Sequence, residues 1–96
     1  MSRPAIFKFR LYIAEGTQNS ALAVANLASL CQAHLRDRHY IEIVDVLRDP
    51  ERALRDKIYM TPTLVKLMPS PVRRIVGTLN QALFVLQALG VEPLSS

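Results

Sequence analysis

The sequence predicts a single α/β domain in which a strand–helix–strand unit is followed by a helix, two strands and a last helix. Apolar residues along residues 6–46 change from strand-like alternation to helical spacing and back to a strand-like run. The chain has 96 residues, half of them hydrophobic, which is enough for one core and too few for two. We therefore treat residues 1–96 as one domain.

The first half carries the clearer pattern. Residues 6–13 alternate apolar side chains with more polar ones, which indicates a strand with one buried face. Asn19 or Ser20 is the expected N-cap of the following helix, which should end near residues 36–39. Residues 40–46 form the predicted second strand. A helix between two such strands predicts a right-handed βαβ unit with parallel strands.

A short helix is predicted next, over residues 51–56. Pro50 suits its first turn, because the missing N–H would have no helical partner there. We expect Ala53, Leu54 and Ile58 to face inward.

Two short strands and a helix complete the predicted fold. The strands are residues 63–68 and 73–76, and the prolines of residues 69–71 impose a turn between them. Gly77 ends the second of these strands. The last helix is expected to begin at a cap formed by Thr78 or Asn80 and to run through Leu89, with Gly90 as its stop signal. This element order is thioredoxin-like.

The chemistry of a thioredoxin is missing from the sequence. The loop after the first strand, residues 14–20, should hold a nucleophilic cysteine at a helix N-terminus, and it contains no sulfur. Ser20 could occupy that position, but no base adjoins it in the sequence. Cys31 is the single cysteine, so a CxxC motif is excluded, and its helical spacing indicates a small buried side chain.

Other ligand and catalytic patterns are also absent from the sequence. His34 and His39 have no cysteine or histidine cluster around them, and the three glycines form no phosphate loop. The net charge of +4 favours an acidic partner, but aromatic residues are not interleaved with Arg73 and Arg74 as in a single-strand binder. We therefore expect no enzyme activity, cofactor, metal or nucleic acid. No apolar run reaches the length of a membrane span, and we expect a cytoplasmic protein.

Several stretches, in order along most of the chain, resemble one family. They are Leu11-Tyr12-Ile13-Ala14, Asn19-Ser20, Val44-Asp45-Val46-Leu47 followed by Pro50, Asp56-Lys57-Ile58, Thr61-Pro62-Thr63-Leu64 with Lys66, and Pro69 through Leu79. Thr-Pro-Thr-Leu alone is weak, but its spacing to Pro-x-Pro-Val-Arg-Arg-Ile-Val-Gly is specific. On these residues the chain resembles the KaiB family of bacterial clock proteins.

The resemblance implies a non-catalytic regulator. KaiB-like proteins bind the N-terminal tier of the KaiC ATPase ring and help to time its phosphorylation cycle, so a KaiC-like ATPase is the expected partner. KaiA, which the bound cyanobacterial form captures, and a histidine kinase are further candidate partners. The expected role is in a circadian or stress-timing system.

The resemblance also implies two folds. A resting homo-oligomer, a dimer or tetramer, would share the βαβ half, residues 5–47, and rearrange residues 50–91. The binding-competent form would be a thioredoxin-like monomer with a cis Thr61-Pro62 bond. Gly77 and Thr78 mark the junction that influences switching, although Gly-Thr-Leu stands here where the family has Gly-Asp-Leu. This departure, with others, predicts a divergent member that works with a KaiC-like partner and without KaiA.

Four basic residues are the expected partner contacts: Lys57, Lys66, Arg73 and Arg74. The competing interpretation of each is ordinary solvated charge. Arg73 and Arg74 are adjacent on a strand, so they should point to opposite faces. Tyr12 and Tyr59 are expected to pack rather than bind.

Three other functions remain open at this point. The first is the sensor domain of a histidine kinase, which shares the thioredoxin-like scaffold. The second is a redox enzyme of thioredoxin or glutathione-transferase type, against which the missing loop cysteine counts. The third is an adaptor without cysteine chemistry for a different acidic partner.

Overall fold

A four-stranded mixed sheet forms the centre of the computed structural model, which describes residues 5–92. Its strands are β1 (Phe7–Ile13), β2 (His39–Asp45), β3 (Thr63–Met68) and β4 (Arg73–Val76), in the order β2-β1-β3-β4. β1 pairs with β2 in parallel and with β3 antiparallel, and β4 runs antiparallel to β3. The predicted element order βαβ-αββα is confirmed.

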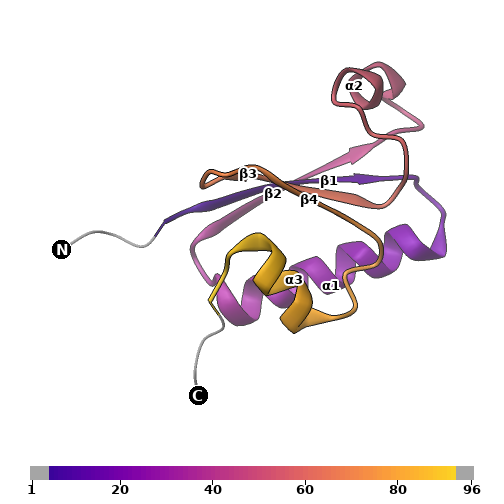
Figure 1. The fold of residues 1–96 in the computed structure, drawn as a ribbon. Helices are drawn as coiled ribbons and strands as arrows, with labels where there is room; N and C mark the ends of the chain where they lie inside the picture. The colour runs from indigo at the N-terminus through magenta and orange to yellow at the C-terminus, as the bar shows by residue number, and fades with distance from the viewer. Residues whose placement is uncertain (1–4, 93–96) are drawn as a thin grey trace.

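The three helices of residues 5–92 are divided unequally between the faces of the sheet. α1 (Gln18–His34) and α3 (Ala82–Leu89) cover one face, whereas α2 (Pro50–Arg55) lies on the opposite side near one end (Figure 1). The face under α2 therefore has much less helical cover. This asymmetry decides which side chains remain available to a partner.

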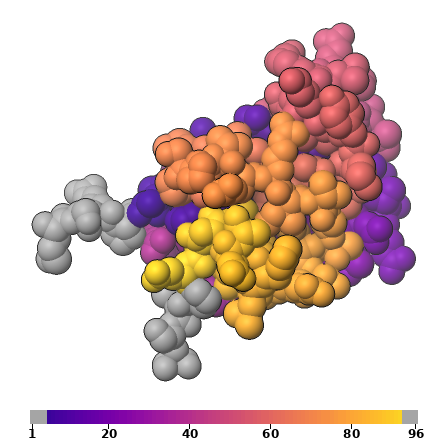
Figure 2. Space-filling view, viewed as in Figure 1, coloured from indigo at the N-terminus to yellow at the C-terminus, as the bar shows by residue number. Residues whose placement is uncertain are grey.

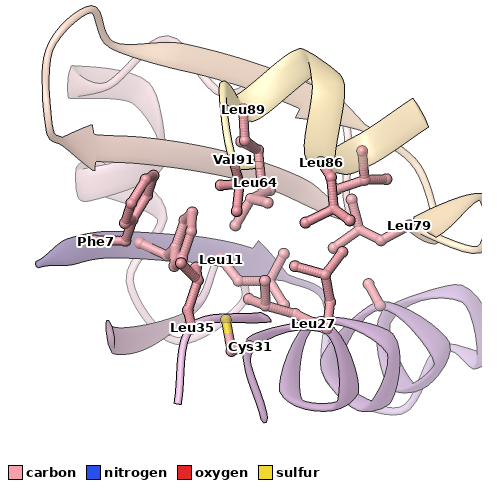
Figure 3. Close-up of a cluster of buried hydrophobic side chains, with 14 residues drawn as sticks. Phe7, Leu11, Leu27, Cys31, Leu35, Leu64, Leu79, Leu86, Leu89 and Val91 are labelled. Atoms are coloured by element: carbon pink, nitrogen blue, oxygen red, sulfur yellow. The ribbon is translucent and has the colours of Figure 1, made fainter. Parts of the chain in front are cut away.

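The larger core lies between the sheet and the two helices α1 and α3 (Figure 3). Phe7, Phe9 and Leu11 of β1 supply one wall, and alternation along the strand directs them to the same face. Leu27 of α1 and Leu86 of α3 are among the fully buried residues opposite them. Each such side chain contributes about 1.5–3 kcal/mol of burial free energy.

A second, smaller core lies on the α2 side of the sheet. Its buried members are Tyr12, Val44, Ala53, Ile58 and Val65. Tyr12 is thus a packing residue, as expected, although its hydroxyl also takes part in a polar contact.

Two helices begin at other residues than the sequence indicated. α1 has Thr17 as its N-cap, because Ser20 is buried and its hydroxyl accepts a hydrogen bond from the Ala14 N–H at 3.0 Å. α3 begins at Ala82 rather than directly after Thr78 or Asn80. The Thr78 carbonyl accepts from Asn26 Nδ2 at 2.8 Å, and Leu79 has a φ of 63°, so this segment is held in a non-helical conformation.

The remaining boundaries follow the predicted signals closely. Asp49 caps α2 through a hydrogen bond from the Arg52 N–H, and Pro50 occupies the first turn. Gly90 ends α3 with a φ of 73°, a left-handed conformation that costs least at glycine. β3 and β4 have the predicted bounds.

Leu86 and Leu83 of α3 offer a test of the larger core. Leu86 is 0% exposed and Leu83 is 73% exposed. Leu86→Ala should lower the free energy of unfolding by about 2–5 kcal/mol, because it leaves a cavity between α3 and the sheet. Leu83→Ala, the matched control, should change it by less than about 0.5 kcal/mol. Urea unfolding measures both, and equal losses would contradict this placement of α3.

Candidate functional site

The segment 47–60, which contains α2, exposes large apolar side chains. They are Leu47, Leu54, Tyr59 and Met60. Figure 2 shows the part of the chain around α2 projecting from the body of the molecule. These four residues and Lys57 are named the α2 surface below. A gathering of exposed apolar side chains within one short segment is typical of a protein interaction site.

The small size of α2 explains this exposure and corrects two expectations. A six-residue helix can place only one side on the sheet, and Ala53 takes that side. Leu54, which was expected to face inward, is therefore 71% exposed. Ile58 fills the next buried position, so Tyr59, expected to pack, is 82% exposed.

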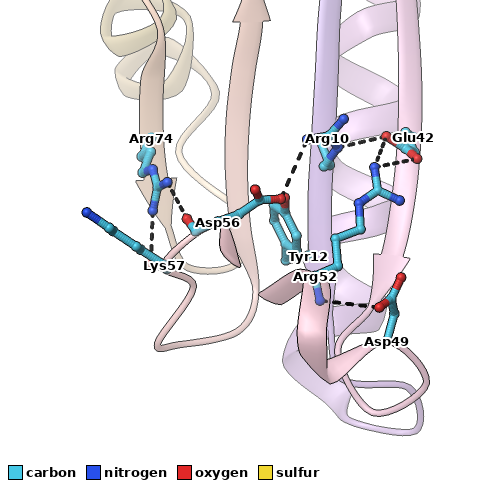
Figure 4. Close-up of polar contacts among 8 residues, drawn as sticks. All are labelled: Arg10, Tyr12, Glu42, Asp49, Arg52, Asp56, Lys57 and Arg74. Carbon is cyan, nitrogen blue, oxygen red and sulfur yellow. Dashed lines mark hydrogen bonds and ion pairs between the residues drawn. The ribbon is translucent and has the colours of Figure 1, made fainter. Parts of the chain in front are cut away.

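The charges around α2 are partly neutralised within the domain. Arg48 pairs with Glu15 and Asp45, and Arg52 pairs with Glu42. Arg55 and Lys57 are exposed, and neither forms an ion pair with a carboxylate in residues 5–92. The Lys57 side chain points away from the strands (Figure 4). The α2 surface thus combines apolar side chains with one cation, Lys57, which suits a partner that also carries acidic residues.

The structure separates the four basic residues expected to contact a partner. Lys57 lies on the α2 surface, and Arg73 is exposed on β4. In the pairing of β4 with β3, Arg74 lies opposite Val65 and Arg73 lies opposite Lys66. The two arginines therefore point to opposite faces of the sheet, as predicted. Arg74 donates to the main-chain carbonyls of Asp56 and Lys57.

Lys66 is buried against α3 and is not available for direct contact. Its side chain extends from the helix-covered face of β3, and its Nζ donates to the Leu89 carbonyl at 3.0 Å. The same ammonium lies 5.9 Å from the centre of the Phe7 ring. Burial lowers the pKa of Lys66, with a smaller contribution from the nearby Arg73 charge. Lys66 therefore joins β3 to the end of α3.

The connection from α2 to β3 is fixed at several points. The Thr61-Pro62 peptide bond is cis, as the resemblance implies, and the Met68-Pro69 and Ser70-Pro71 bonds are also cis. The Pro62 carbonyl accepts from the Gly77 N–H at 3.0 Å. The Thr63 hydroxyl donates to the Met60 carbonyl at 2.6 Å. The first hydrogen bond joins Pro62 to the residue after β4, and the second joins Met60 to the start of β3.

Cys31 lies on the buried side of α1, within the larger core. Burial raises the pKa of its thiol to about 12, so almost none of it is thiolate at neutral pH. Within residues 5–92, no three His, Cys, Asp or Glu side chains are grouped to hold a metal ion. Over the same residues, no helix is long and apolar enough to cross a bilayer.

Sequence comparison identifies the family. Residues 10–91 match the KaiB domain. The chain belongs to the KaiB family. It is 43% identical over 84 residues to the circadian clock protein KaiB3 of Synechocystis sp. strain PCC 6803, covering 88% of this chain and 82% of that relative. It is 39% identical over 89 residues to a circadian clock oscillator protein KaiB of Prochlorococcus marinus, covering 93% of this chain and 76% of the relative.

Solved structures confirm that the fold is thioredoxin-like. This KaiB-family chain matches the N-terminal domain of Synechococcus elongatus SasA with a TM-score of 0.72 at 17% identity, covering 94% of this chain and 89% of that one. It matches chloroplastic thioredoxin z with a TM-score of 0.74 at 19% identity, covering 88% and 76% of the two chains. At these identities the likeness concerns the fold alone.

The apolar members of the α2 surface were not among the predicted site residues of this KaiB-family protein. One signal in the sequence could have found them. Leu47, Leu54, Tyr59 and Met60 all lie within or beside a helix of six residues, which cannot bury apolar side chains on every side. The prediction from the sequence rested on basic residues instead, and the fold shows which apolar side chains around the short helix stay exposed.

Glu42 of β2 connects β1 to α2 through a partly exposed ionic network. Its carboxylate accepts from Arg10 Nε at 2.7 Å and from Arg52 Nη2 at 2.8 Å (Figure 4). The hydrogen bond from Arg10 lowers the pKa of Glu42, and the bond from Arg52 adds to this effect. The ionised carboxylate is thus favoured in the folded state.

Labelling of Cys31 should report the burial of its thiol. At about pH 8 a disulfide reagent should react with the native protein at least ~100-fold more slowly than with a small-molecule thiol, because both access and thiolate are lacking. The urea-unfolded chain, as control, should react at the small-molecule rate. Rapid labelling of the native chain would contradict the buried position of Cys31.

Glu42→Gln should alter the acid sensitivity of the fold. Because the pKa of Glu42 is lower in the folded than in the unfolded state, its contribution is present above about pH 4.5 and is lost as pH falls further. Between about pH 6 and pH 3, the free energy of unfolding should fall further in the native protein than in Glu42→Gln. The difference between the two losses should be less than about 1 kcal/mol, because the network is partly exposed.

Urea unfolding at the two pH values measures this difference. Glu92→Gln, which changes an exposed carboxylate outside the network, is the control and should behave like the native chain. The same loss of stability in Glu42→Gln and in the native protein would show that the network does not contribute.

Proposed function

We propose that this KaiB-family protein binds a KaiC-like ATPase ring through its α2 surface and so modulates the ring's phosphorylation or ATPase cycle in a circadian or stress-timing system. Membership of the KaiB family, whose named relatives are circadian clock proteins, supports the kind of role. The exposure of the apolar side chains around α2 is the structural observation that supports the location.

The proposed role is binding rather than catalysis. The turn between β1 and α1, where a thioredoxin carries its nucleophile, has no cysteine, and Ser20 at the start of α1 is buried and bonded to Ala14. Cys31 lies further along α1 and faces the core. A surface of exposed leucine, tyrosine and methionine suits protein recognition, since aromatic residues and methionine are enriched at interfaces.

Within this proposal, Lys57 keeps the role of a direct contact, because it is exposed on the α2 surface. Arg73 is exposed on the helix-covered face, opposite to α2, so its predicted contact would lie outside the α2 surface. Lys66 does not, because its ammonium is enclosed by Phe7 and the end of α3. Leu54 and Tyr59 are added as the apolar centre of the contact. KaiA and a histidine kinase remain proposed further partners of the same domain.

The proposal includes a second packing of residues 50–91 and a resting homo-oligomer. α3 supports this idea, because Leu83 and Phe84 are exposed on its outer side while Val85, Leu86 and Leu89 are buried. A short helix with apolar residues on both sides has another face to bury. Two packings of one half can coexist when their free energies differ by a few kcal/mol. Gly77 and Thr78 lie at the start of the segment that joins β4 to α3.

Binding to a purified KaiC-like ATPase ring, loaded with ATP or with ADP, tests the function. Tyr59→Ala and Leu54→Ala should each weaken binding at least ~10-fold, because they remove large side chains from the centre of the contact. Leu22→Ala is the control, an exposed leucine on α1 outside residues 50–91, and should leave the affinity within ~2-fold. Interferometry or calorimetry measures these affinities. Absence of binding in both nucleotide states would refute the proposal, and a loss only with Leu22→Ala would move the interface to α1.

A further inference from the structure

The Arg74 side chain on β4 is hydrogen-bonded to the main chain at the end of α2. Its guanidinium donates through Nη2 to the Asp56 carbonyl at 2.5 Å and through Nη1 to the Lys57 carbonyl at 3.0 Å (Figure 4). Asp56 is the C-cap of α2 and Lys57 follows it, so neither carbonyl has a donor from a further helical turn. The planar fork of an arginine can bind both at once, whereas a lysine cannot match this geometry.

Asp56 is held from the opposite side as well. Its carboxylate accepts from the buried Tyr12 hydroxyl and lies 3.7 Å from Arg10 Nη1, both on β1. The main chain of Asp56 is therefore bonded to β4 and its side chain to β1. Two strands that are not neighbours in the sheet thus fix a single residue at the end of α2.

The residue after Asp56 needs such support. Lys57 has a φ of 58°, a left-handed conformation that is unfavourable for a residue with a Cβ. That turn buries Ile58 and leaves Tyr59 and Met60 exposed. The bond from Arg74 to the Lys57 carbonyl acts on the peptide unit that directly follows the unfavourable dihedral angle.

We propose that Arg74 is a positioning residue, which affects partner binding through its bonds to Asp56 and Lys57 rather than by touching the partner. These bonds hold Lys57, Tyr59 and Met60 in the conformation that the partner binds. This inference rests on the proposed function for its effect on binding, whereas its structural part concerns the unbound protein. It assigns Arg74 a role different from the direct contact that its charge suggests.

Hydrogen exchange of the unbound protein tests the structural part. The Lys57 and Ile58 amides donate to the carbonyls of Leu54 and Ala53. In Arg74→Ala these two amides should exchange at least ~10-fold faster, while the amides of α1 stay unchanged. Arg74→Lys should give an intermediate effect, and the control Arg73→Ala none. Unchanged exchange at Lys57 and Ile58 in Arg74→Ala would overturn the inference, whatever the protein binds.

A double-mutant cycle tests the effect on binding to the KaiC-like ring. Arg74→Ala should weaken binding ~10-fold in the native background but less than ~3-fold in the Tyr59→Ala background, because the presented side chain is already gone. Arg74→Ala should also keep the native salt dependence, whereas Lys57→Ala should make it shallower. Additive losses, or a shallower salt dependence in Arg74→Ala, would show direct contact and overturn the inference.

The two arms separate the possible failures. If the native chain fails to bind the ring in either nucleotide state, the proposed function fails, and the exchange experiment still decides whether Arg74 fixes the end of α2. If native binding is strong and Arg74→Lys binds as well as the native chain while Lys57 and Ile58 exchange faster, the segment need not be fixed for binding, and the positioning role is overturned.

Discussion

Strand β1 lies between β2 and β3, and the alternation of its side chains decides what each face of the sheet does. Phe7, Phe9 and Leu11 point towards α1 and α3 and form a wall of the larger core. Arg10 and Tyr12 point to the other face, where they meet Glu42 and Asp56. A shift of one residue in the pairing of β1 would exchange these two sets and destroy both the core and the attachment of α2.

The unequal cover of the two faces follows from this division. The helix-covered face buries a continuous apolar layer, so it needs two helices. The other face carries a small apolar cluster with a rim of ion pairs, and a helix of six residues is sufficient to cover that cluster. Because α2 is so short, its outer side and the turns around it stay exposed, and these residues form the α2 surface.

Basic residues in this chain have three different roles, which cannot be told apart from their charge alone. Lys66 is buried and bonds to the end of α3, Arg74 bonds to carbonyls at the end of α2, and Lys57 is exposed beside apolar side chains. A cation is costly to bury unless hydrogen bonds compensate it, so Lys66 needs its carbonyl partner. The same residue type thus contributes to the fold in two places and is available to a partner in a third.

The sequence by itself determined the order of the elements, the bounds of β3 and β4, the burial of Cys31 and the family. These features depend on local spacing, on turn residues such as Pro50 and Gly90, and on motifs read in order along the chain. The start of α3 and the exposure of Leu54 and Tyr59 were decided by tertiary structure. Tertiary structure also decided the different roles of Lys57, Lys66 and Arg74, because the surroundings of each side chain depend on strands and helices far away in the sequence. Local spacing shows which residues share a face, and only the packed fold shows whether another element covers that face.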